Sequence, residues 1–113
     1  MPNPDPSMNG EILTMELEQD GEAIVIRPSG ELDMSTAPVL DAALREAMDS
    51  ERTQVIVDLG GLSFIDSTGL RLLVVAAERS RKAGNRLRLL RGSEPVERML
   101  EVSGLQRSLP FVD

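Results

Sequence analysis

The alternation of two hydrophobic periods along the chain is the feature that most limits its fold. Leu13, Met15 and Leu17 alternate with polar residues, as on one face of a strand. Farther along, apolar residues recur at helical spacing within 40–48 and again within 70–77. Strands that alternate with helices are typical of the α/β class, in which helices cover a largely parallel sheet.

We therefore predict one α/β domain with the order strand, strand, helix, strand, helix, strand, helix, strand. The strands are expected at 13–18, 23–30, 53–59 and 86–90, with a short edge strand in 108–113, because Pro110 disfavours a central one. Helices are expected at 35–48, 67–83 and 93–104. The turn at 19–22 favours an antiparallel hairpin, and the helical crossovers favour parallel pairing. The result is a mixed sheet of four to five strands with helices packed on it.

The chain has 113 residues, which is the size of a single domain. Its opening, MPNPDPSMNG, predicts a flexible tail over 1–11, followed by the domain at 12–113. Hydrophobic residues make up 41% of the chain, which is enough for a core. Phe64 and Phe111 are the two aromatic residues, so this core must be aliphatic.

Composition removes several classes of function. The chain has no histidine and no cysteine, which excludes Ser-His-Asp catalysis, thiol nucleophiles, disulfides and the usual zinc sites. Its net charge of −7 argues against nucleic acid and anionic membranes as partners. The basic residues between Arg79 and Arg91 alternate with Leu87 and Leu89, which predicts a solvated strand face. No signal peptide or membrane span is visible, so we expect a cytoplasmic protein. We also expect no cofactor and no metal.

The stretch FIDSTGL, residues 64–70, lies where the third predicted strand gives way to a helix. Functional groups in α/β sheets collect beyond the carboxyl ends of strands. Asp33 follows the second predicted strand and Asp66 the third, so we expect these two acids to be neighbours. Ser67 falls at the position expected for a helix cap, and either Ser67 or Asp66 could cap the helix. Asp33 either caps the following segment or shapes this site, and Asp58 before Gly60-Gly61 is predicted to form a turn.

Catalysis by Ser67 has little support. A serine hydrolase needs a base, and Lys82, the single lysine, lies about 22 Å farther along the same predicted helix at 1.5 Å per residue. No phosphate-binding GxxxxGK[ST] motif is present. An enzyme that uses Asp33 and Asp66 as an acid–base pair remains a weak alternative. The chemistry favours Ser67 as a phosphoacceptor, because a helix N-terminus tolerates the added anion while a docked partner would meet a dianion beside two acids.

Three segments carry a resemblance to a known family. They are GELDMSTAPVL at 30–40, VIVDLGGLSFIDSTGLRLLVVAAERSRKAGNRLRLL at 55–90 and VERMLEVSGL at 96–105. The chain resembles the STAS domain family, and within it the stand-alone bacterial anti-sigma factor antagonists. The run DSTGL preceded by LSFI is the specific part of the match.

The resemblance implies a regulatory binding protein that is not an enzyme. The unphosphorylated protein would bind an anti-sigma factor that is also a GHKL-type serine kinase, and phosphorylation would release it. A PPM-type phosphatase would restore the binding form, and the protein would act as a monomer or weak dimer. Ser67 corresponds to the phosphoacceptor, with Thr68 as a secondary candidate. Partner contacts are expected from the following residues: Asp33, Asp66, Ser67, Thr68, Gly69 and Arg71. The alternative is a STAS module that binds a nucleotide or small ligand, or acts as a scaffold, without a phosphoswitch.

Overall fold

The computed structural model describes residues 13–112, so the tail predicted for 1–11 lies outside the described residues. The chain begins with an antiparallel hairpin formed by β1 (Leu13–Asp20) and β2 (Ala23–Leu32). The sheet continues in parallel from β2 to β3 (Gln54–Asp58) and from β3 to β5 (Leu87–Leu90). Beyond β5, residues 110–112 add a bridge in which Phe111 pairs with Leu89, so the predicted edge strand is present as this short contact.

A fourth strand, β4 (Leu62–Ile65), was not predicted from the sequence. It follows a 3-10 turn, η1 (Leu59–Gly61), and pairs in parallel with the last residues of β2. The four residues are buried, exposed, exposed and buried in turn, so the period of two is broken by a register shift. The prediction that Asp66 follows the third strand was therefore wrong, because η1 and β4 intervene. Asp58 forms the predicted turn, since its carboxylate accepts the Gly60 N–H.

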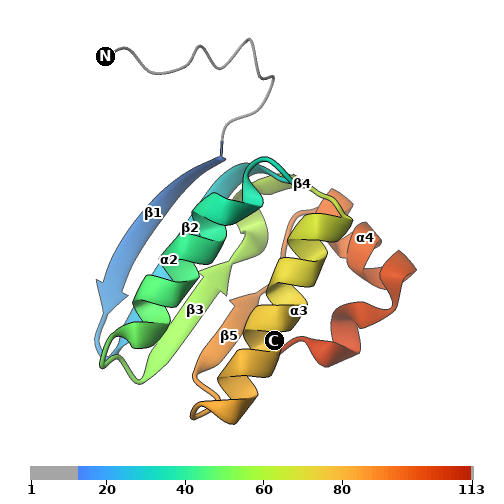
Figure 1. Cartoon of the computed structure of the whole chain (residues 1–113). Helices are drawn as coiled ribbons and strands as arrows, with labels where there is room; N and C mark the ends of the chain where they lie inside the picture. Colours follow the sequence, from blue (N-terminus) through green and yellow to red (C-terminus); the bar gives the residue numbers. More distant parts are fainter. Residues whose placement is uncertain (1–12, 113) are drawn as a thin grey trace, which may run out of the picture.

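Three helices complete the domain. Helices α2 (Ala37–Asp49) and α3 (Ser67–Lys82) lie side by side on one face of the sheet, as Figure 1 shows. Helix α4 (Glu94–Ser103) contacts β4 and continues into a second 3-10 turn, η2 (Leu105–Ser108). The predicted stop of α4 is confirmed, because Gly104 has a φ of +74° that L side chains rarely adopt.

The core lies between the sheet and the helices, and α4 contributes the fully buried Val96 and Leu100 to it. Its largest fully buried side chains are all Leu, Ile or Val. Phe64 is 44% exposed, and the ring of Phe111 lies 4.1 Å from the Arg91 guanidinium at the sheet edge. The predicted stripe on α3 is confirmed, with Leu70, Leu73 and Ala77 buried and Val74 packed against the core. The structure is thus a single α/β domain whose five-stranded mixed sheet and aliphatic core follow the prediction.

Candidate functional site

The first turn of α3 begins at Asp66, which is its N-cap residue. The Oδ1 atom of Asp66 accepts the Gly69 N–H at 2.9 Å, and the Asp66 carbonyl accepts the Leu70 N–H at 2.9 Å. Ser67 is consequently the first residue within the helix, so of the two candidates for the cap it is Asp66 that occupies this position, and placing Ser67 there was wrong. An aspartate satisfies the cap better here because a carboxylate also complements the positive end of the helix dipole.

Asp66 also joins α3 to the segment that precedes α2. Its Oδ2 atom accepts the Met34 N–H at 3.2 Å, and its backbone N–H donates to the Leu32 carbonyl at 3.1 Å. These contacts cross 32 or more residues of sequence. The segments that carry Asp33 and Asp66 are therefore adjacent at the carboxyl ends of β2 and β4, as the sequence predicted.

Asp33 organises the entry to α2. Its Oδ1 accepts the hydroxyl of Ser35 at 2.7 Å and the backbone N–H groups of Ser35 and Thr36 at 2.9 and 3.1 Å. The hydrogen bond from the Ser35 hydroxyl, with the backbone and Thr36 hydrogen bonds, lowers the pKa of Asp33 below its ordinary value, although desolvation opposes this. Asp33 thus takes the capping role, and Thr36, the nominal cap of α2, is buried with its own hydroxyl bonded to the Glu31 carbonyl.

These contacts bear on the acid–base alternative. A general acid at neutral pH needs a raised pKa, whereas hydrogen bonds lower that of Asp33. Both oxygens of Asp66 accept backbone N–H groups. The two carboxylates hold the loops in place, which leaves little support for an acid–base pair.

Ser67 and Thr68 are both exposed on the first turn of α3. Within residues 13–112, neither hydroxyl forms a hydrogen bond, so both are open to a reagent from solvent. The helix behind them has 16 residues, and its free N–H groups and dipole favour an anion at this end. This first turn, residues 66–68, which we call the corner, therefore offers an accessible hydroxyl where an added phosphate is electrostatically tolerated.

Gly69 lies beneath this turn and is buried. A Cβ at this position would come within 2.7 Å of the Leu32 Cγ, 2.9 Å of the Leu32 carbonyl oxygen and 3.0 Å of the Ile65 Cγ1. Glycine is therefore required for α3 to approach the ends of β2 and β4 so closely. Close packing thus accounts for the glycine at position 69, and a contact between Gly69 and the partner remains a prediction.

The structure adds two exposed apolar side chains at this end of the sheet. Met34 is 75% exposed and follows Asp33, and Phe64 is 44% exposed in β4. The sequence carried a signal for Met34, which is a large apolar residue within the polar run ELDMST. Arg71 is exposed on α3, where it borders a surface hollow together with Met34 and Thr68.

Residues 13–112 contain no cluster of three or more carboxylates that could hold a metal ion. No helix in this part of the chain has the length and apolar character needed to span a bilayer.

The family model for the STAS domain matches residues 14–113, which is nearly the whole chain. The chain belongs to the STAS domain family. Among curated relatives of this STAS domain, the anti-sigma-B factor antagonist of Listeria monocytogenes is 35% identical over 88 residues, covering 78% of this chain and 77% of the relative.

Solved structures agree with this assignment. An anti-sigma factor antagonist from Mycobacterium paratuberculosis aligns with a TM-score of 0.77 at 26% identity, covering 88% of this chain and 85% of the other. The antagonist SpoIIAA in its unphosphorylated form aligns with a TM-score of 0.70 at 28% identity, covering 88% and 89%. The Bacillus SpoIIAA in its phosphorylated form aligns with a TM-score of 0.64 at 27% identity, covering 88% and 92%.

Proposed function

We propose that this STAS domain is an anti-sigma factor antagonist that is switched by phosphorylation of Ser67. The unphosphorylated protein binds an anti-sigma factor that is also a GHKL-type serine kinase, and so frees a sigma factor for transcription. The observation that carries the proposal is the exposed Ser67 hydroxyl at the N-terminus of α3, beside the loop held by Asp66. The antagonist names of the relatives, and the two forms of SpoIIAA, support it.

The covalent step is a phosphoryl transfer from ATP. The Ser67 oxygen attacks the γ-phosphorus, the bond between that phosphorus and the bridging oxygen of ADP breaks, and the hydroxyl proton passes to a base of the kinase. A PPM-type phosphatase reverses the modification by hydrolysis. This chain supplies the nucleophile and its position, and it performs no catalysis in the proposal.

Phosphorylation would act on the surface of the domain. The phosphate adds about 1.5 to 2 negative charges at pH 7, next to Asp66 and near Asp33. A partner seated on the corner would have to desolvate this group or tolerate its repulsion. A loss of about 1.4 kcal/mol already lowers affinity tenfold, so release needs no change of fold.

The test begins with intact-mass measurement after incubation with ATP and each GHKL-type kinase of the source organism. One added phosphate is expected on the tryptic peptide 53–71, whose hydroxyl residues are Thr53, Ser63, Ser67 and Thr68. Fragmentation must place it on Ser67. The modification should disappear in Ser67→Ala and persist in Thr68→Ala.

Binding measurements complete the test. The kinase that modifies the protein should bind the wild type and Ser67→Ala, and should bind the phosphoprotein at least about tenfold more weakly. Equal affinity for the two phosphorylation states would refute the switch. If no kinase binds or modifies the folded protein, the proposal fails, and the ligand-binding or scaffolding alternative takes its place.

A further inference from the structure

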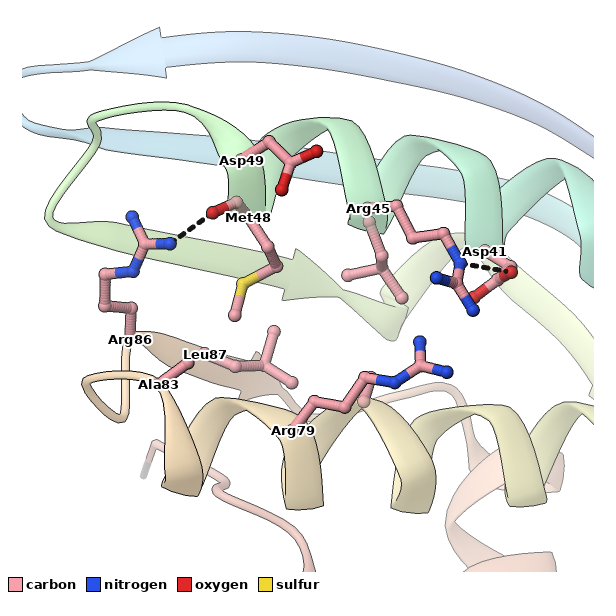
Figure 2. Close-up of a pocket in the computed structure, with 10 residues that line it drawn as sticks. Asp41, Arg45, Met48, Asp49, Arg79, Ala83, Arg86 and Leu87 are labelled. Atoms are coloured by element: carbon pink, nitrogen blue, oxygen red, sulfur yellow. Dashed lines mark hydrogen bonds and ion pairs between the residues drawn. The ribbon is translucent and has the colours of Figure 1, made fainter.

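A groove runs between α2 and α3 on the surface of the domain, starting next to the Ser67 corner. It consists of two adjoining hollows of about 340 and 310 Å³ that share Asp41 and Arg79. The first is bordered by Met34 and Thr68, and the second reaches the C-terminal ends of both helices. Figure 2 shows Arg79 extending from α3 toward the Asp41–Arg45 pair on α2 in the second hollow.

Apolar side chains line both hollows, and charged side chains lie among them, including Asp41 and Asp49. The apolar side chains come from both helices, from the loop before α2 and from β5. They are Met34, Ala37, Pro38, Leu44, Met48, Leu72, Val75, Ala76 and Leu87. Among the large hydrophobic residues in this list, Met34 is the most exposed. A surface of this kind suits the apolar side of an amphipathic helix.

Two arginines on α3 border the groove without a counter-ion. Within the part of the chain that the structure describes, Arg71 and Arg79 form neither an ion pair nor a side-chain hydrogen bond, and both are exposed. In contrast, Arg45 pairs with Asp41, and Arg86 is bound to backbone carbonyls. Arg71 and Arg79 are eight positions apart on the same side of α3, which places their Cα atoms about 12 Å apart.

The charge of the groove differs from that of the molecule. The chain carries a net charge of −7, yet the groove is lined by four arginines and two acids, Asp41 and Asp49, and two of the arginines, Arg71 and Arg79, have no partner within residues 13–112. Arginine binds carboxylates through a planar fork, so these positions favour an acidic partner. Because Thr68 borders both the groove and the corner, a partner that covers Ser67 extends naturally along this strip.

We propose that the groove between α2 and α3 is the docking site for an acidic amphipathic helix of the anti-sigma factor. This inference rests on the function proposed above, and it extends the partner contact from the corner, where Arg71 is already expected to contribute, along the groove to Arg79. The helix would lie along α3 with carboxylates about eight residues apart against Arg71 and Arg79, and with apolar residues between them on the groove floor. The corner then controls release, while the groove supplies affinity and selects among kinases.

The two contacts separate in kinase kinetics. Loss of the groove contact weakens docking and leaves the Ser67 hydroxyl in place. Charge reversal at Arg71 and Arg79 should therefore raise the KM of the kinase for this protein with little change in kcat. Damage to the corner itself would lower kcat.

The experiment compares Arg71→Glu/Arg79→Glu with Arg98→Glu/Arg107→Glu. The control makes the same change in net charge at exposed arginines that do not border the groove. With the kinase that binds the wild type, the groove variant should lose at least about tenfold in affinity and much of its salt dependence. The control should change affinity by less than about threefold. Thermal unfolding by circular dichroism verifies that both variants remain folded.

The other outcomes are distinguishable. If the groove variant and the control bind equally, the docking site is refuted while the phosphoswitch stands. If the wild type binds no kinase, both proposals fail. If sedimentation shows a wild-type dimer that the groove variant abolishes, the groove is a contact between two copies and the inference is wrong. Restored binding between the groove variant and a kinase with arginines in place of the matching acids would be the strongest support.

Discussion

The Asp66 carboxylate caps α3 through one oxygen and holds the Met34 backbone through the other. Asp66→Ala removes both contacts and should lower the free energy of unfolding by about 1–2 kcal/mol, the usual loss for an aspartate cap. Asp66→Asn should lose less stability, because the amide oxygen can still accept the Gly69 N–H. The amide nitrogen is a donor, so the hydrogen bond from the Met34 N–H is lost. Urea unfolding followed by circular dichroism measures the three proteins.

Glu46→Ala is the control for Asp66, because Glu46 is an exposed acid in the middle of α2. It should change stability by less than about 0.5 kcal/mol. If Asp66→Asn were as unstable as Asp66→Ala, the carboxylate charge at the helix end would matter more than the hydrogen bonds. If Asp66→Ala and Asp66→Asn were both as stable as the wild type, the capping role of Asp66 would be contradicted.

At the scale of secondary-structure elements, Arg86 ties the end of α2 to the residues before β3. Its guanidinium donates to the carbonyl of Ser50 at 3.1 Å and to that of Arg52 at 2.6 Å, and also to that of Met48 (Figure 2). A positive charge at this end also complements the helix dipole. Arg86 was predicted to belong to a solvated basic face, but it closes this end of the groove.

Arg86→Ala should therefore lower the free energy of unfolding by about 1.5–3 kcal/mol, since it leaves carbonyls without their charged donor. Arg86→Lys should recover part of this loss, because an ammonium cannot reach three carbonyls in fork geometry. Arg98→Ala provides the comparison. It breaks an exposed pair with Glu94 and should change stability by less than about 0.5 kcal/mol in the same urea experiment. An Arg86→Ala protein as stable as Arg98→Ala would show that the end of α2 is satisfied by water.

For the molecule as a whole, the proposed switch requires that a negative charge at position 67 leaves the fold intact. Ser67→Asp should keep the free energy of unfolding within about 1 kcal/mol of the wild type, because the α3 dipole offsets the nearby acids. Ser80→Asp, on the same helix, is the comparison in which the added charge is buried. Ser80 is 1% exposed and its oxygen accepts the Leu87 N–H at 2.9 Å, so a charge there should destabilise by about 3 kcal/mol or more.

Thermal unfolding of the two variants separates the possibilities. A large loss of stability in Ser67→Asp would mean that modification acts by loosening the domain, which contradicts a switch confined to the surface. A stable Ser67→Asp protein with a destabilised Ser80→Asp protein is the expected result.

The sequence was most informative where structure depends on near neighbours. The hairpin at 13–32, the stripe at Leu70, Leu73 and Ala77, and the end of α4 at Gly104 all follow from residues within a few positions. The strand β4 was missed because four residues with a broken period carry little signal of their own. It forms because the end of β2, about 30 residues earlier in the chain, offers an open edge.

The sequence by itself determined the α/β class, the aliphatic core and a helix that starts at the DSTGL run with accessible hydroxyls. Hydrophobic period and capping chemistry act locally, and such preferences can be read from the residues directly. Only the tertiary structure decided which residue caps α3, how Asp66 holds the Met34 loop and where Arg71 and Arg79 face. Those depend on packing between distant segments, because the free energy of each contact arises only when both partners are brought together.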